Sequence, residues 1–174
     1  MNDEFIHENF TLEQLVVSNY WFAKVKEVIS VTDPDTIKVS LDLGYSVTYT
    51  PSKGARLAGI DGPEKTSSNP NEIVQSKRLT EFIQKFCKVK ISKKENLYAI
   101  SKSLDMYGRP LIELLYATPH SNILSSFNKW MYTYGLVHGY DGKEKRIPWT
   151  IQQVLDLQAK LDYMQGAKSF SDYF

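Results

Sequence analysis

The sequence has few residues that could supply sulfur or nitrogen ligands to a metal. Among its 174 residues there is a single cysteine, Cys87, which excludes an intrachain disulfide and a cysteine-rich metal site. We expect Cys87 to pack in the core. The three histidines, His7, His120 and His138, are scattered without ligand spacing, and we interpret each as a surface or incidental residue.

Long apolar runs are missing as well. No stretch approaches the roughly 18 apolar residues that a membrane-spanning helix needs. The first residues, MNDEFIHENFTLEQL, are acidic and polar, whereas a secretory signal has a basic start followed by an apolar run. We therefore expect an intracellular, cytoplasmic protein with no membrane partner.

The chain has no large excess of either charge, because its net charge is only +1. The charges are nevertheless unevenly distributed. Residues 1–35 hold seven acids and two lysines, whereas residues 71–103 hold eight Lys or Arg and three acids. Clustered basic groups supply much of the affinity of a protein for a polyanion. The basic window is consistent either with a phosphate-facing surface or with an ordinary solvated helix and hairpin.

The length and composition predict one compact globular domain. Domains commonly hold about 100 to 200 residues, and the chain is 42% hydrophobic and 13% aromatic, as in ordinary globular proteins. We predict a polar amino-terminal extension over residues 1–18, with a short helix over residues 11–17, and a single domain over residues 19–174.

Hydrophobic periodicity divides this domain into strands and helices. Alternating or β-branched runs separated by turn residues predict strands, and these cover residues 21–31, 36–43, 45–50, 55–60, 88–92, 97–101 and 110–117. Apolar residues at helical spacing, with capping residues at the ends, predict helices. The first helix is capped by Asn69 and includes residues 70–87. The second lies within residues 122–134 and ends before Gly135. The third runs from the Thr150 and Gln153 capping box to Gly166.

This order of elements predicts an α+β or mainly β fold. A small, mainly antiparallel sheet tends to close into a barrel that the helices cover from outside. The pattern alone does not distinguish a barrel from a sandwich. We predict a five-stranded oligonucleotide-binding (OB-fold) barrel with about three α-helices.

Four acidic residues stand in two turns at predicted strand ends. Asp33 and Asp35 lie in TDPDT, and Asp61 and Glu64 lie in IDGPE. Each alone is consistent with an ordinary turn residue, because a short acidic side chain bonds nearby backbone groups. Together they suit a hard cation such as Ca²⁺ or Mg²⁺, which takes several oxygen ligands.

Two arginines accompany these acids. Arg56 begins the strand that leads to Asp61, and Arg109 ends the turn DMYGR. Guanidinium groups bind phosphate oxygens in a forked geometry, so arginines that face a metal and a free carboxylate would suit phosphoryl transfer. Ordinary surface salt bridges explain the spacing equally well. Strand alternation also places the side chains of Arg56 and Asp61 on opposite faces unless the chain bends.

Four separated motifs together resemble one known family. DTIKV, RLAGIDGPE, DMYGR and NKWMYTYGL occur in the order, and nearly with the spacing, of the staphylococcal nuclease (thermonuclease) family. The resemblance extends from about Tyr20 to about Phe170. It implies a Ca²⁺-dependent nuclease that hydrolyses phosphodiester bonds of DNA and/or RNA with little sequence specificity, prefers single-stranded regions and leaves 3′-phosphates. Mg²⁺ is the less favoured metal.

The resemblance also assigns roles to matching residues. It implies that Ca²⁺ is held by the carboxylates of Asp35 and Asp61 and by the main-chain carbonyl of Gly62. The remaining roles are a carboxylate that activates or orients water (Glu64), phosphate clamps (Arg56 and Arg109), positions near the metal (Asp33 and Thr36) and tyrosines beside the substrate (Tyr107 and Tyr140).

The chain departs from the family pattern at three positions. Pro34 replaces a glycine, Gly62 replaces a threonine, and Met106 stands where a lysine is common. The first two need not affect metal binding, since a carbonyl ligand does not depend on its side chain, but without the lysine we expect a weaker substrate contact.

Two other functions remain as alternatives. Staphylococcal nuclease-like domains that have lost active-site residues are non-catalytic nucleic-acid-binding OB-fold modules, but the presence of all five carboxylates and arginines favours an enzyme here. The amino-terminal extension or the final residues SFSDYF could in addition bind an inhibitor or partner protein.

Overall fold

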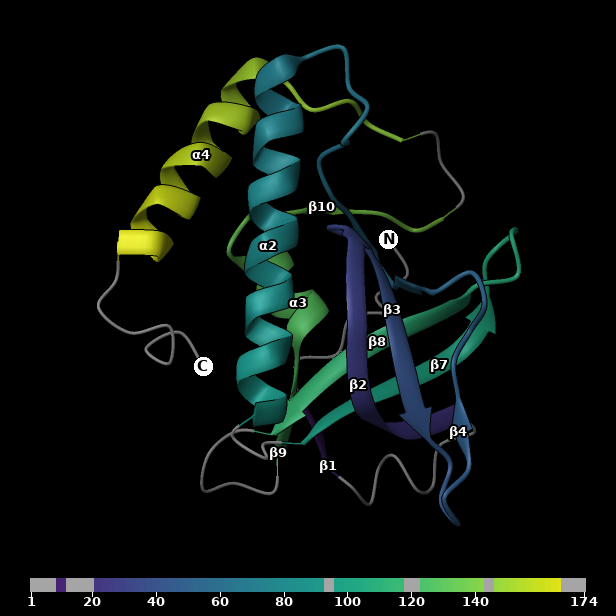
Figure 1. Cartoon of the computed structure of the whole chain (residues 1–174). Coiled ribbons are helices and arrows are strands. Elements are labelled where there is room, and N and C mark those ends of the chain that lie inside the picture. The colour runs from purple at the N-terminus through teal and green to yellow at the C-terminus, as the bar shows by residue number, and fades with distance from the viewer. Residues whose placement is uncertain (1–8, 12–20, 93–95, 118–122, 143–145, 167–174) are drawn as a thin grey trace.

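Five strands close into a barrel, as predicted. The structure is a computed structural model that describes residues 9–11, 21–92, 96–117, 123–142 and 146–166 (Figure 1). The barrel strands follow one another in the order β8-β5-β3-β2-β7, and β7 pairs back with β8. The pair between β5 and β8 is parallel and the other barrel pairs are antiparallel. The bounds of the barrel strands are Trp21–Asp33 (β2), Thr36–Asp42 (β3), Ala55–Leu57 (β5), Leu97–Leu104 (β7) and Pro110–Ala117 (β8).

The long strand β2 allows the sheet to close. Its first residues pair with β7, and from Lys24 to Asp33 it pairs with β3. Three register shifts interrupt the pairing with β3. Such irregularities bend a strand and increase its twist, so one strand can belong to both sides of the barrel.

Shorter strands extend this sheet. β4 (Thr48–Tyr49) pairs with β3, β9 (Ile123–Ser126) pairs with β8, and β1 (Asn9–Thr11) pairs with β9. Thr11 therefore lies in a strand and not in the predicted short helix, whose other residues, 12–17, lie outside the described part of the chain. A separate two-stranded sheet joins β6 (Ile60–Asp61) to β10 (His138–Gly139).

Helix α2 (Pro70–Ser92) begins where the sequence predicts and runs further. The Asn69 side chain accepts the backbone N–H of Asn71 at 3.0 Å, as a capping residue does. The strand predicted over residues 88–92 is wrong, because these residues form the last turns of α2. Lys90, four residues after Phe86, continues the buried face of the helix, and its ammonium group lies 5.1 Å from the centroid of the Tyr116 ring.

The two later helices agree with their sequence signals. In α3 (Phe127–Thr133) the Ser126 side chain accepts the N–H of Lys129, and Gly135 follows with φ +63°. α4 (Ile151–Gly166) begins with the predicted capping box: the Thr150 N–H donates to Gln153 Oε1 at 2.9 Å and the Gln153 N–H donates to Thr150 Oγ1 at 3.3 Å.

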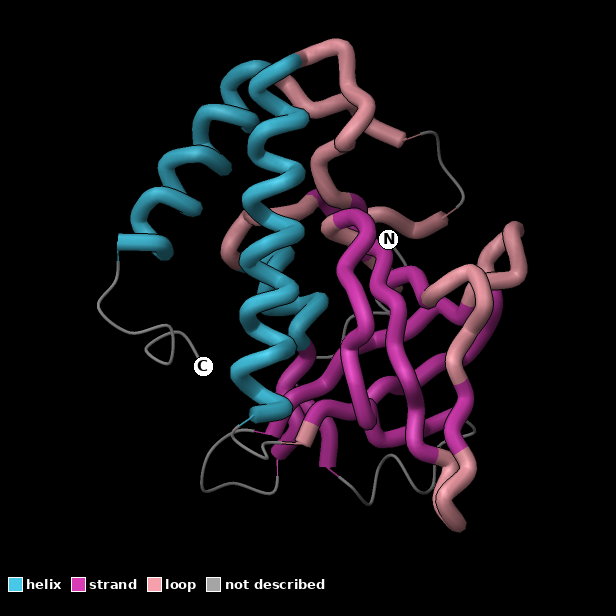
Figure 2. Tube along the Cα trace, in the orientation of Figure 1, coloured by secondary structure: helices cyan, strands magenta, loops and turns pink. Residues whose placement is uncertain are grey.

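The helices lie against one side of the barrel (Figure 2). α2 packs along β2, and α4 packs on α2 (Figure 1). The core between helix and barrel is aromatic and aliphatic; Phe86, for example, is fully buried and stacks on Phe127 with ring centroids 4.1 Å apart. Cys87 lies in this core as predicted, and burial raises its thiol pKa to about 12. No helix among the described residues is both long enough and apolar enough to cross a bilayer.

Candidate active site

The turn between β2 and β3 places Asp35 at one end of the barrel. The Asp35 side chain is buried, and the Asp35 main-chain carbonyl accepts the N–H of Leu57 at 2.7 Å. The Thr36 hydroxyl donates to Asp35 Oδ1 at 2.9 Å. The Thr36 bond orients the carboxylate, and the Leu57 bond holds the backbone that carries it.

A bend after β5 brings Arg56 and Asp61 together. Gly59, with φ +74°, turns the chain between β5 and β6. Arg56 Nη1 lies 2.9 Å from Asp35 Oδ2, and Arg56 Nη2 lies 3.2 Å from Asp61 Oδ1. The guanidinium group therefore joins the two carboxylates, which come from different turns.

Glu64 lies in the loop that follows, held in place by Glu72 of α2. One oxygen of the buried Glu72 carboxylate accepts the backbone N–H of Glu64 at 2.8 Å, and the other accepts the Ser67 hydroxyl at 2.6 Å. The Glu64 side chain is 40% exposed. Glu72 thus anchors the loop through the Glu64 N–H and the Ser67 hydroxyl, while the Glu64 carboxylate lies partly exposed at the surface.

Asp105 holds Arg109 at the edge of the same site. Its Oδ1 accepts the N–H groups of Tyr107 and Arg109 at 2.9 and 2.8 Å, and its Oδ2 accepts Arg109 Nε at 2.6 Å. Burial alone would raise the pKa of Asp105, but these hydrogen bonds and the Arg109 charge lower it below its ordinary value. Arg109 Nη1 lies 3.5 Å from Thr36 Oγ1, at the limit of a hydrogen bond, so Thr36 links Arg109 to Asp35.

Both tyrosines expected beside the substrate lie next to an arginine of the site. The Arg56 guanidinium carbon lies 5.4 Å from the centroid of the Tyr140 ring, and that of Arg109 lies 5.5 Å from the centroid of the Tyr107 ring. Asp33 is the exception among the ten predicted site residues. Its carboxylate pairs with Lys65 Nζ at 3.1 Å and not with the arginines of the site.

Arg146, just before α4, is a site residue that the sequence analysis missed. Its Nε donates to Asp61 Oδ2 at 2.5 Å, and its Nη2 donates to the Gly62 carbonyl at 2.5 Å. Its Nη1 forms an ion pair with Glu64 Oε1. Arg146 belongs to none of the recognised motifs, and only its positive charge marks it in the sequence.

The Asp61 carboxyl has an environment of opposing effects. Burial raises its pKa above the ordinary value, the charge and hydrogen bond of Arg146 lower it, the Asp35 charge raises it and Arg56 lowers it, and the net result is an increase. His138, which pairs with Asp61 across β6 and β10, has its pKa lowered by burial, against the charges of Asp61 and Glu72. His138 is also stacked on Trp149 at 4.0 Å, so it is a packed residue beside the site and not incidental.

The oxygen atoms of the site suit a hard cation in kind. Asp35 and Asp61 contribute carboxylates. Gly62 contributes a main-chain carbonyl, which accepts a hydrogen bond from Arg146 as Asp61 does. However, among the described residues no three His, Cys, Asp or Glu side chains form a group that could hold a metal ion. The guanidinium groups of Arg56 and Arg146 hold the candidate ligand oxygens instead.

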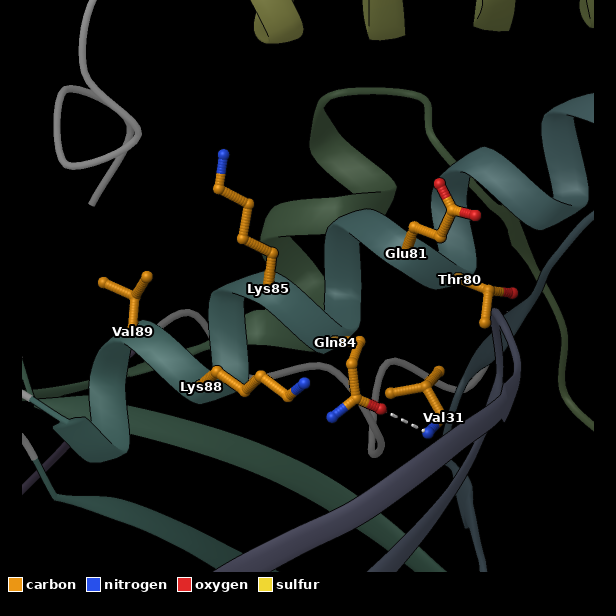
Figure 3. A pocket seen from close by; sticks show the side chains of 7 residues that line it. All are labelled: Val31, Thr80, Glu81, Gln84, Lys85, Lys88 and Val89. Atoms are coloured by element: carbon orange, nitrogen blue, oxygen red, sulfur yellow. Dashed lines mark hydrogen bonds between the residues drawn. The ribbon is translucent and has the colours of Figure 1, made fainter.

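Four described basic residues of the window 71–103 lie in other surroundings. Lys90 is buried, and Arg78 pairs with Asp162 of α4 at 2.7 Å. Lys85 and Lys88 line a hollow of about 480 Å³ between α2 and β2 (Figure 3). Its other lining residues are Val31, Thr80, Glu81, Gln84 and Val89, none of which belongs to the predicted site.

Comparison with protein-family models and with curated proteins finds no significant match to this chain.

Proposed function

We propose that this protein is a Ca²⁺-dependent nuclease that hydrolyses phosphodiester bonds of single-stranded DNA or RNA with little sequence preference. One observation carries the proposal: Arg56 joins the carboxylates of two separate turns, Thr36 links Arg109 to Asp35, and Arg146 links Glu64 to Asp61. The motif resemblance to staphylococcal nuclease agrees with this arrangement and names the reaction.

A phosphodiester would meet complementary charge here. Arg56 and Arg109 are both only partly exposed, with side-chain exposures of 16% and 20%. A guanidinium group carries five N–H donors in a planar fork, so each can bind a phosphate oxygen while it keeps a carboxylate partner. Because negative charge grows on these oxygens as water approaches phosphorus, such fixed donors stabilise the transition state more than the ground state.

The cation would be held by Asp35, Asp61 and the Gly62 carbonyl, and when bound it would supply positive charge opposite the reacting phosphate. The Glu64 carboxylate, 40% exposed, would serve as the general base once its ion pair with Arg146 is broken. It would accept a proton from the attacking water or align that water, while the bond from phosphorus to the 5′-oxygen breaks and that oxygen takes up a proton. The expected products are a 3′-phosphate and a 5′-hydroxyl.

The surroundings of the two arginines suit an unpaired strand. Tyr107 and Tyr140 present rings beside Arg109 and Arg56, and bases of single strands stack on aromatic rings without regard to sequence. The contacts proposed here reach phosphates and ring faces, which carry little sequence information.

A second candidate is a non-catalytic nucleic-acid-binding barrel. It is favoured by the guanidinium groups that hold the candidate ligand oxygens, together with the absence of a three-residue metal group among the described residues. Incubation of the purified protein with labelled single-stranded DNA, duplex DNA and RNA, each with Ca²⁺, Mg²⁺ or chelator, separates the two. Ca²⁺-dependent cleavage supports the enzyme, whereas binding of the strand without cleavage under any condition supports the second candidate.

A further inference from the structure

Arg146 occupies the atoms that the proposed function assigns to the cation and to water activation. Its three nitrogen atoms contact Asp61 Oδ2, the Gly62 carbonyl and Glu64 Oε1, so one guanidinium group spans all three positions. The Arg146 side chain is 34% exposed, whereas that of Asp61 is 4% exposed. Arg146 thus covers a buried carboxylate from the solvent side.

A divalent cation and this guanidinium group cannot share these oxygens at low cost. Hard cations bind carboxylate and carbonyl oxygens directly, at about 2.3 to 2.6 Å for Ca²⁺. Two positive groups that bind the same oxygens would lie a few ångströms apart in a partly buried site, where screening is weak. Their repulsion therefore makes binding of the cation and the Arg146 contacts mutually antagonistic.

The charges of the site lead to the same conclusion. Asp35, Asp61 and Glu64 carry three negative charges, and the guanidinium groups that contact them, Arg56 and Arg146, carry two positive charges. A divalent cation that replaced Arg146 would bring the cluster to neutrality. One that entered beside Arg146 would leave it with an excess positive charge, in a site where burial already penalises uncompensated charge.

We propose that Arg146 is a built-in competitor for the cation: it closes the cation-free site through Asp61, Gly62 and Glu64, and cation binding displaces it and releases Glu64. This inference rests on the proposed function, since it concerns the same cation. Arg146 therefore sets the cation concentration at which the protein becomes active, and it keeps the Glu64 carboxylate engaged below that concentration.

Direct titration with Ca²⁺ alone tests the proposal without any substrate. Isothermal titration calorimetry on the wild type, Arg146→Gln and Arg146→Lys should give a dissociation constant at least about tenfold lower for Arg146→Gln, as expected when a charge-assisted competitor is removed. Arg146→Lys keeps the positive charge but loses the planar guanidinium group. Its affinity for Ca²⁺ should therefore lie between those of the wild type and Arg146→Gln. Arg78→Gln is the matched control, because it removes an arginine paired with Asp162 on α4 and should leave Ca²⁺ affinity unchanged.

Thermal unfolding provides a second measurement. Without Ca²⁺ the wild type should be more stable than Arg146→Gln, because the variant loses the contacts that Arg146 makes with three groups. Saturating Ca²⁺ should raise the Tm of Arg146→Gln more than that of the wild type.

The outcomes separate this inference from the proposed function. If the wild type binds Ca²⁺ and Arg146→Gln binds it equally or more weakly, the inference is wrong and the proposed function stands. If neither binds Ca²⁺ and neither cleaves nucleic acid, both are wrong. Detectable binding only in Arg146→Gln supports the inference.

Discussion

Pro34 and Gly62 pack so closely that a Cβ atom on residue 62 would overlap the Cβ of Pro34. These are two of the three positions where the sequence does not match the expected staphylococcal nuclease motifs. The two departures are therefore matched: the proline between the turn acids requires a residue without a side chain at position 62.

The first prediction concerns this pair. Gly62→Ala should lower the free energy of unfolding by about 1 to 3 kcal/mol, the usual cost of overpacking. In the Pro34→Gly background the same change should cost at least about 1 kcal/mol less, because the overlapping ring is gone. Urea unfolding of the four proteins in the cycle measures this coupling.

Gly166→Ala is the control, since nothing lies within 4 Å of a Cβ added there. Equal costs of Gly62→Ala with and without Pro34 would show that the two positions are independent.

The second prediction concerns the proposed base. Glu64→Gln should lower kcat for cleavage of single-stranded DNA by about 10²- to 10⁴-fold, the usual range for a general base. Its unfolding free energy should fall by at most about 1 kcal/mol, because the ion pair with Arg146 that it weakens is partly exposed and the loop is held through the Glu64 N–H. Glu81→Gln, an exposed glutamate of α2, is the matched control. Turnover of Glu64→Gln close to that of the control would remove Glu64 from the mechanism.

The third prediction concerns the arginine at the edge of the site. Arg109→Ala should lower kcat/KM by about 10²- to 10³-fold, with most of the loss in kcat, because its contacts strengthen as charge develops on the phosphate. Steady-state kinetics on an oligonucleotide measures both constants. Arg78→Ala removes an equivalent charge elsewhere and should leave them unchanged. A rise in KM alone would mean that Arg109 binds substrate and transition state equally.

The fourth prediction concerns the acid that holds Arg109. Because the folded-state pKa of Asp105 lies below its ordinary value of 3.8, its ionised form adds stability above pH 3.8, and that stability is lost as the pH falls through the folded-state pKa. Asp105→Asn should therefore be less stable than the wild type by about 1 to 3 kcal/mol at pH 7. The difference should shrink as the pH falls below 3.8.

Urea unfolding at a series of pH values checks this dependence. Asp156→Asn, at an exposed position of α4, removes a carboxylate from another element and is the matched control. A difference between wild type and Asp105→Asn that stayed constant with pH would mean that the ionised carboxylate is not what stabilises the turn.

Much of the fold could be predicted from local sequence signals. The capping box of Thr150 and Gln153 and the glycine after α3 have direct structural counterparts. The prediction of a strand over residues 88–92 is wrong because the alternation in KVKIS is typical of a strand, whereas Lys90, four residues after Phe86, also continues the buried face of a helix. Lys90 is buried with its ammonium group over the Tyr116 ring, a contact between parts of the chain that are distant in sequence and that only the helix provides.

The site shows the same limit. Asp35, Arg56 and Asp61 could be selected as chemically suitable, but their contact depends on the bend at Gly59, which strand alternation does not predict. Arg146 reaches Asp61 from 85 residues away and belongs to no motif. Residue type and spacing thus identify the groups that could act, while tertiary packing determines which of them meet.

The most direct test of the account is cleavage of a single-stranded oligonucleotide by the wild-type protein, with analysis of the product ends. Cleavage should occur in Ca²⁺ and stop when chelator is added, and its products should carry 3′-phosphates and 5′-hydroxyls. Folded protein that binds Ca²⁺ and the strand but produces no cleavage would contradict it.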